Sequence, residues 1–200
     1  NAIFTFGCHA EIYTESVILR ESIDIMAKAV NSIYEEIYSG KPWQELDWIT
    51  QESNRSTADY IPIMLFLAGL SEDEVIDRDI LTEDNDLAEI LARTEQLRWL
   101  AFHAATGFSP LSIADMRRRF ETFKGDGSAL DYCRKDVKAR LHVCLTTWDN
   151  LEDINKAYRE LATIDGNKKE QERDFKKNDR DIVKYIPKYV QASKSNEKSV

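Results

Sequence analysis

Two residues of types that bind metals or act as nucleophiles, His142 and Cys144, stand two positions apart in the segment RLHVCLTTWDNL. In an extended chain their side chains would point to the same side, as the ligands of a metal ion or a Cys-His couple do. A zinc site needs about four ligands. The chain offers only four further histidines and cysteines: Cys8, His9, His103 and Cys133. No Cys-x-x-Cys, His-Glu-x-x-His, Gly-x-Ser-x-Gly or glycine-rich phosphate loop is present. We therefore expect no metal site and no enzyme, and we interpret Cys144 as a small buried apolar side chain.

An arginine followed by Tyr-Ile-Pro occurs twice, in SNRSTADYIPIML and in NDRDIVKYIPKYV. The two segments align without a gap: Arg55 with Arg180, Tyr60 with Tyr185, Ile61 with Ile186 and Pro62 with Pro187. Seven helical residues make nearly two turns, so each arginine would share a helix stripe with its proline. A guanidinium in that place offers a planar fork of donors to an anion. It could equally form a structural ion pair with a nearby carboxylate of Glu52, Asp59, Asp179 or Asp181. Because duplicated residues usually preserve a fold, we favour the ion pair.

The duplication extends beyond these two segments. The run from Ile25 to Lys28 aligns with the run from Ile90 to Arg93, and WQEL from Trp43 aligns with WDNL from Trp148. Each unit reads as a helix, a turn, a Trp-x-x-Leu segment and a second helix with the arginine. Such self-similarity indicates two copies of one supersecondary unit, neither of which can bury its apolar face alone. We predict an all-α fold of two pseudo-symmetric helical repeats packed on each other.

Only seven glycines and four prolines punctuate the chain, which favours long helices. We expect the following organisation: residues 1–15 as a strand-like remnant of an upstream domain or a linker, 16–70 as the first repeat, 71–85 as an acidic connector, 86–190 as the second repeat with an insertion at 109–140, and 191–200 as a frayed polar tail. Pro62 should break or kink its helix, because proline cannot donate to the carbonyl four residues back. The connector is typical of a solvated segment, with an acidic docking surface as the alternative.

The stretch DLAEILARTEQLRWLAFHAATGF is apolar most of the way round a helix, which is typical of a central helix. Its polar residues Glu95, Arg98 and His103 would then lie near the core, where they need partners. Glu95 and Arg98 are three residues apart and could pair along one face. For His103, a hydrogen bond to a backbone carbonyl is favoured over a contact with a ligand.

Trp148 follows His142 and should face the helix that carries Arg180. An indole to stack on and a guanidinium to receive a phosphate would together suit a nucleotide. The candidate ligand site therefore consists of five residues: Arg98, His103, His142, Trp148 and Arg180.

The composition limits the classes of protein to which the chain can belong. Hydrophobic residues make up 42% of the 200 positions and charged residues 32%, and the formal net charge is −9. This charge argues against a nucleic-acid-binding surface, which requires massed Lys and Arg. No run approaches the roughly 20 apolar residues of a membrane helix. Three cysteines cannot all pair, which favours a reducing, cytoplasmic setting.

The segments EQLRWLAFHAATGF, RLHVCLTTWDNL and DFKKNDRDIVKYIP together resemble the ryanodine-receptor repeat, or RyR domain. The matching positions of the second half are Trp99, Gly107, Phe108, His142, Cys144, Leu145, Trp148, Leu151, Asp179 and Arg180, and those of the first half are Tyr34, Trp43, Leu46, Asn54 and Arg55. The chain departs from the family at Val143, where proline is usual, at Phe108, where tryptophan is commoner, and at Asn54, where aspartate is expected. The resemblance thus implies a shared helical fold more firmly than a shared ligand.

The resemblance also implies a function. Bacterial members of this kind follow a TrkA-like, Rossmann-type NAD-binding domain, so NAD would belong to an upstream domain and no cofactor to this one. No catalysis is attributed to such repeats, and a role in sensing nucleotide-derived ligands is implied for bacterial members. We therefore expect a non-catalytic ligand-sensing or protein-interaction module of a bacterial cytoplasmic protein. The alternative is a purely structural protein-protein interaction domain of a larger Rossmann-containing protein, which would dock through the acidic segment.

Overall fold

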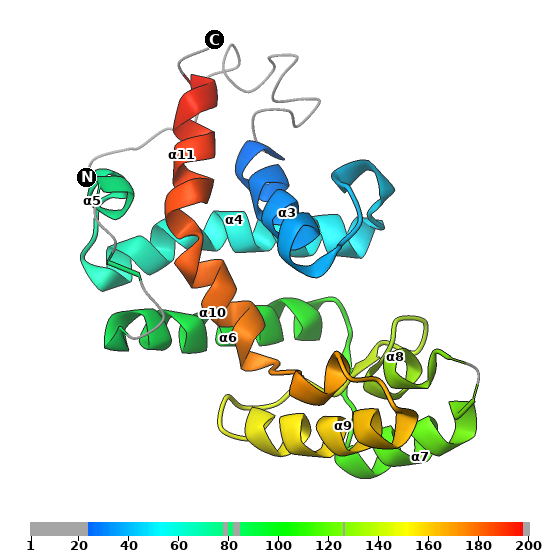
Figure 1. The fold of residues 1–200 in the computed structure, drawn as a ribbon. Coiled ribbons are helices and arrows are strands. Elements are labelled where there is room, and N and C mark those ends of the chain that lie inside the picture. The colour runs from blue at the N-terminus through cyan, green and yellow to red at the C-terminus, as the bar shows by residue number, and fades with distance from the viewer. Residues whose placement is uncertain (1–23, 78–79, 82–84, 126, 198–200) are drawn as a thin grey trace, which may run out of the picture. The chain divides into compact units, whose positions relative to one another are not determined.

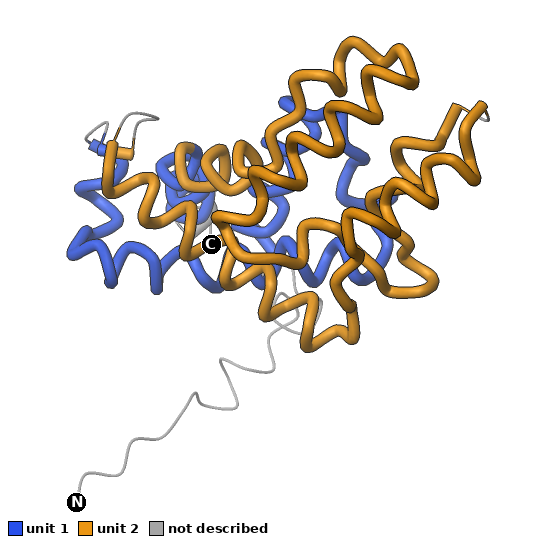
Figure 2. Tube along the Cα trace, turned by 90° about the horizontal axis from the view of Figure 1, so that it is seen from below, with its two compact units in different colours: residues 1–80, 185–200 blue, residues 81–184 orange. Residues whose placement is uncertain are grey.

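The computed structural model describes residues 24–77, 80–81, 85–125 and 127–197. The predicted helical class is confirmed, because 72% of the structure is helical and 4% is strand (Figure 1). The expected strand-like segment at residues 1–15 lies outside the described residues. Two compact units are distinguished, residues 1–80 with 185–200 as unit 1 and residues 81–184 as unit 2 (Figure 2). The last helix therefore groups with the first half of the chain, although the sequence placed it in the second repeat.

The described part of unit 1 contains α3 (Asp24–Tyr38), the short 3-10 helix η1 (Trp43–Glu45), α4 (Trp48–Ala68), α5 (Glu72–Asp77) and α11 (Ile186–Glu197). Helix α3 packs against α4 and α11, and α11 also packs against α5. Their shared core contains these buried side chains: Ala27, Val30, Met64, Leu65, Val75, Ile186, Tyr189 and Val190. The expected acidic connector thus holds a helix, and the expected frayed tail is helical to Glu197.

Helix α4 has well-defined ends. The side chain of Asp47 accepts a hydrogen bond from the backbone N–H of Thr50 at 2.7 Å, and Gly69 ends the helix in the left-handed conformation at φ 67°. A break at Pro62, one of the two expected outcomes, does not occur, because α4 continues through it to Ala68, and the alternative of a kink stays a prediction. Pro62 itself is exposed, and the carbonyl that loses its usual donor is that of Ala58, four residues earlier. Its counterpart Pro187 lies in the first turn of α11, where no such bond is lost.

Unit 2 contains α6 (Asp86–Ala105), α7 (Ile113–Phe123), α8 (Ala129–Arg134), α9 (Leu151–Asp165), η2 (Glu170–Glu172) and α10 (Lys176–Lys184). Helix α10 packs on α6, while α7, α8 and α9 pack on one another. The core of this unit includes Leu91, Met116, Phe120, Leu130, Val143, Leu151, Ile154, Tyr158, Leu161 and Val183. The described part of the predicted insertion at 109–140 contains the helices α7 and α8.

The insertion also contributes two short strands that the sequence did not predict. The sheet has the order β1-β3-β2, in which β1 (Ser109–Pro110) pairs in parallel with β3 (Leu141–His142), and β2 (Lys135–Asp136) pairs with β3 in antiparallel fashion. Gly107, at φ 83°, turns the chain from the end of α6 into β1. The sheet holds His142 in the central strand, beside the C-terminal end of α6.

Candidate functional site

The side chain of Arg180 on α10 is held by two carboxylates of unit 2. Its Nε and Nη2 donate to the two oxygens of Glu89 at 2.8 and 3.1 Å, and its Nη1 donates to Asp174 at 3.2 Å. The guanidinium also lies over the ring of Trp148, 5.5 Å from its centroid. Hydrogen bonding to Arg180 lowers the pKa of Glu89, so the carboxylate is charged at neutral pH. The three donor nitrogens are thus occupied by the protein itself, which is the structural ion pair that the duplication favoured.

The same arrangement surrounds Arg55 in unit 1. Its Nε and Nη2 donate to the two oxygens of Asp24 at 2.7 and 2.8 Å, and its Nη1 donates to Glu52 at 2.6 Å. Its guanidinium lies 5.3 Å from the centroid of the Trp43 ring. The hydrogen bond to Asp24 raises the pKa of Arg55 further above its ordinary value. Arginine, carboxylate and tryptophan therefore occur together twice, once in each unit.

The sequence predicted Glu52 as a partner but not Asp24, Glu89 or Asp174. The expected partner Asp181 bonds instead to Lys177 at 2.7 and 2.8 Å. A signal for the missed pairs was available, because Asp24 and Glu89 occupy the positions just before the aligned runs that begin at Ile25 and Ile90.

A further contact is matched between the units. The side-chain amide of Asn31 on α3 donates to the carbonyl of Lys41 at 3.1 Å, and that of Gln96 on α6 donates to the carbonyl of Thr146 at 3.2 Å. Both amides occupy aligned positions, and both carbonyls lie two residues before the aligned tryptophans. In each unit an amide thus ties the first helix to the Trp-x-x-Leu segment.

Trp148 is 8% exposed and has two more cations near its ring, besides Arg180. Arg93 and Lys176 lie 5.8 and 5.4 Å from its centroid. Arg93 also lies 3.7 Å from a carboxylate oxygen of Asp149. Two of these three cations, Arg180 and Arg93, are themselves paired with carboxylates, so the indole is packed among charged groups of the protein.

The two histidines lie in an aromatic cluster of unit 2. His103 stacks on Trp99 at 4.0 Å between ring centroids, and its Nδ1 lies 3.0 Å from the carbonyl oxygen of Trp99, to which an N–H can donate. His142 meets Trp99 edge-on at 5.0 Å, and its Nδ1 accepts the backbone N–H of Cys144 at 3.0 Å. Burial lowers the pKa of both, that of His142 to about 3, so both rings are neutral at pH 7. The backbone partner favoured for His103 is thus present.

The thiol of Cys144 is buried, and burial raises its pKa to about 12. Its link to His142 runs through the backbone N–H and not through the sulfur. A thiol of this kind is protonated at neutral pH and is a poor nucleophile or metal ligand. Within the ranges that the structure describes, no three His, Cys, Asp or Glu side chains form a group that could hold a metal ion.

Arg98 forms the ion pair with Glu95 that their spacing predicted. Its Nε and Nη2 each donate to an oxygen of Glu95 at 2.8 Å, and both residues are buried. Asp179 lies close by on α10, and burial, together with the charge of Glu95, raises its pKa well above its usual range. The five predicted site residues therefore fall into an ion pair at Arg98, an aromatic cluster at His103 and His142, and a stacked ion pair at Trp148 and Arg180.

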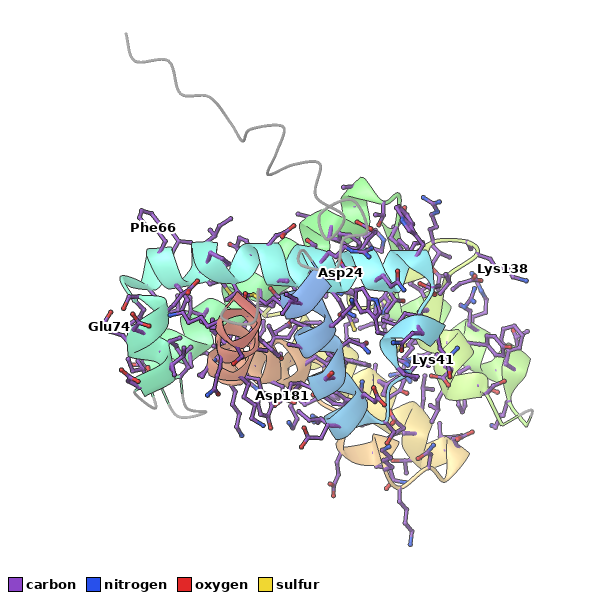
Figure 3. The ribbon with its side chains drawn as sticks, turned by 90° about the horizontal axis from the view of Figure 1, so that it is seen from above. Asp24, Lys41, Phe66, Glu74, Lys138 and Asp181 are labelled. Atoms are coloured by element: carbon purple, nitrogen blue, oxygen red, sulfur yellow. The ribbon has the colours of Figure 1, made fainter. Side chains whose placement is uncertain are left out.

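Two surface features of unit 1 were not predicted as sites. The first, which we call the α4 patch, consists of Ile63, Phe66 and Leu67, exposed by 49%, 82% and 62%. Figure 3 shows Phe66 projecting away from α4. The second is a groove of about 500 Å³ between α3 and α11. The signal for the patch was the run IMLFL at positions 63–67, which has more apolar residues than one buried helix face requires.

No family model, curated protein or solved structure matches this chain. Among the described helices, none has the length and apolar content needed to cross a membrane.

Proposed function

We propose that this chain is a non-catalytic protein-interaction module that binds a basic amphipathic helix of a partner protein at the α4 patch. The observation that carries the proposal is the exposure of Phe66, 82%, on a helix whose opposite face forms the core. Single exposed apolar residues are common, but a cluster on one helix face is typical of an interaction site. Ile63, Phe66 and Leu67 have the spacing i, i+3, i+4 and therefore share a face.

Asp59 beside the α4 patch and the acidic character of the chain indicate the chemistry of the partner. Asp59 is exposed one turn before Ile63, on the same stripe. Helix α5, which follows α4, has three acids in its first turn, Glu72, Asp73 and Glu74. Glu72 and Asp73 lie 3.4 and 2.6 Å from the Nζ of Lys194, so one lysine is shared between two carboxylates. Since the net charge is −9, a basic partner is attracted and an acidic one repelled.

Sensing of a nucleotide-derived ligand by Arg98, His103, His142, Trp148 and Arg180 stays a prediction of the sequence. The contacts of these residues support a role in holding the fold, since Arg98 and Arg180 already donate to carboxylates. The RyR assignment, the two-repeat organisation, the bacterial cytoplasmic setting and the upstream NAD-binding domain also stay predictions. The matched surroundings of Arg55 and Arg180 support the two-repeat organisation.

Peptide binding tests the proposed function. A fluorescent Leu/Lys amphipathic helix and a Leu/Glu helix of equal length and hydrophobicity would be titrated with the protein, and binding followed by fluorescence anisotropy at two salt concentrations. We expect binding of the basic peptide only, weakened at higher salt, since exposed charges are screened. The double variant Phe66→Ser/Leu67→Ser should weaken binding at least tenfold, and Asp59→Lys should reduce its salt dependence.

The matched control is Ile164→Ser, which removes an apolar side chain of 55% exposure from α9 in unit 2. This variant should change the affinity by less than twofold. Equal binding of both peptides, or equal loss in the control, would contradict the proposal. A self-association of the protein that Phe66→Ser/Leu67→Ser abolishes would also contradict it, because a second copy would then cover the patch.

A further inference from the structure

A second surface feature of unit 1, independent of the α4 patch, is the groove between α3 and α11. Figure 1 shows α11 alongside α3, and the groove between them has a volume of about 500 Å³. This lies within the range of about 300–1,000 Å³ that is typical of small-molecule sites. Half-buried Ile25 and Ile33 of α3 contribute apolar surface to it, and Ser32 and Ala192 contribute small side chains. The groove therefore has space for a small molecule, and part of its lining is apolar.

Two lysines line this groove, one from each helix. Lys28 of α3 is half-buried and Lys188 of α11 is exposed. The Nζ of Lys188 lies 4.8 Å from the centroid of the Tyr185 ring. Among the described residues, neither lysine forms an ion pair with a carboxylate, whereas Arg55 in the same unit pairs with two. These two ammonium groups, which have no carboxylate partner in the part of the chain that the structure describes, line a groove with apolar surface and provide a local site for an anion in a protein of net charge −9.

The internal alignment shows that the fold does not require these residue types. When the alignment of Arg55 with Arg180 is continued, Lys188 corresponds to Ile63 and Ala192 to Leu67. In the alignment that matches Ile25 with Ile90, Ser32 corresponds to Leu97. Ile63, Leu67 and Leu97 therefore show that large apolar side chains at the aligned positions are compatible with helix formation. Lys188 thus makes the groove more basic than the helical fold requires, and the small side chains of Ala192 and Ser32 make it wider.

We propose that the α3–α11 groove binds a small amphipathic anion, with its carboxylate or phosphate head between Lys28 and Lys188 and its apolar body on Ile25 and Ile33. A flexible ammonium acts as a point charge and accepts either head group, whereas a guanidinium would select a planar one. The apolar body adds affinity by leaving water. Neither a bare inorganic anion nor a neutral alcohol has both features.

Isothermal titration calorimetry of the full chain with four probes tests this site. Decyl phosphate and decanoate have both features, inorganic phosphate has only the charge, and decanol has only the apolar body. We expect saturable binding of decyl phosphate or decanoate at one site, at least tenfold tighter than that of inorganic phosphate or decanol. The tighter of the two amphipathic probes identifies the preferred head group. Equal affinity for all four probes, or no binding of the two amphipathic ones, overturns the proposal.

Two kinds of variant locate the site. Lys28→Gln/Lys188→Gln should weaken binding at least tenfold, while Lys168→Gln/Lys169→Gln, which changes the net charge equally at an exposed turn of unit 2, should have less than a twofold effect. Equal weakening by both pairs would mean that only net charge matters, and would overturn the proposal.

A groove-filling variant, Ser32→Leu/Ala192→Leu, should abolish binding without changing any charge. It introduces the leucines that the counterpart positions already carry, and circular dichroism should confirm that the helices are retained. Phe66→Ser/Leu67→Ser should leave binding of the probes unchanged, because the α4 patch is a separate surface. Loss of probe binding in that variant would overturn the assignment to the groove.

Discussion

Exchange of the buried ion pair of Glu95 and Arg98 for the residues at the matched positions of unit 1 is expected to be nearly neutral. These positions hold Val30, which is fully buried, and Ile33. The perturbation is therefore Glu95→Val/Arg98→Ile, made alongside each single substitution. Unit 1 shows that a helix of this type can carry apolar side chains at both places.

The magnitude follows from the geometry of the pair. Arg98→Ile removes both hydrogen bonds, of 2.8 Å each, from a carboxylate that is 0% exposed. Breaking a buried pair on one side costs about 3–5 kcal/mol, because the remaining charge is left unpaired. Replacing both partners by packed apolar residues is instead often neutral or stabilising by about 1–4 kcal/mol. The double variant should therefore be at least about 3 kcal/mol more stable than Arg98→Ile.

Urea denaturation followed by circular dichroism measures these free energies of unfolding. The reasoning would be refuted if the double variant lost about as much stability as the two single variants added together, because the residues would then not act as a pair. A cost of less than about 1 kcal/mol for Arg98→Ile would refute it as well, because the two hydrogen bonds between Arg98 and Glu95 would then contribute little to stability.

Three further predictions, each measured by chemical denaturation, concern His142, Asp179 and the pair of prolines Pro62 and Pro187. His142 has a folded-state pKa of about 3 against the ordinary 6.5, so between these values the unfolded chain binds more protons and the free energy of unfolding falls as pH falls. His142→Asn, which can still accept the N–H of Cys144, should remove up to about 1.4 kcal/mol per pH unit of that slope; an unchanged slope would contradict the burial of the ring. Asp179 has a raised folded-state pKa, so its effect is opposite: stability falls as pH rises above the unfolded pKa of about 3.9, and Asp179→Asn should raise the free energy of unfolding at neutral pH. Lower stability of Asp179→Asn at pH 7 would show that the charged carboxylate is needed. Pro62→Ala should stabilise α4 by about 1–3 kcal/mol because it restores an interior hydrogen bond, whereas Pro187→Ala, in the first turn of α11, should change stability by less than about 0.5 kcal/mol; equal effects of the two would contradict this explanation.

The sequence predicted two contacts that lie within one helical turn, one of them as an alternative among four carboxylates. The pairing of Glu95 with Arg98 and that of Glu52 with Arg55 follow from a spacing of three residues, which fixes two side chains on one face. The contact of Arg180 with Glu89 joins residues 91 positions apart. Its geometry depends on how α10 packs on α6, and no local pattern specifies that packing.

The end of α11 and the continuity of α4 were missed for a related reason. The polar composition from residue 191 onward predicted a frayed tail, but Lys194 reaches the acids of α5 and the helix continues to Glu197. The penalty of Pro62 predicted a break, but the helix packing of unit 1 maintains α4 around it. Tertiary contacts therefore override the weak local preference in both places.

The matched contacts of the two units separate residues that hold the fold from residues that are available for function. Arginine, carboxylate, tryptophan and amide keep their types and contacts in both units, so their presence needs no ligand to explain it. Other aligned positions on exposed or half-buried faces differ in residue type, such as Lys188 and Ile63. The fold does not require a particular side chain at these positions. Selection for binding can act there without loss of stability. At these aligned positions, Ile63 contributes to the apolar α4 patch and Lys188 contributes to the basic α3–α11 groove. The two aligned segments therefore carry surfaces of different chemistry.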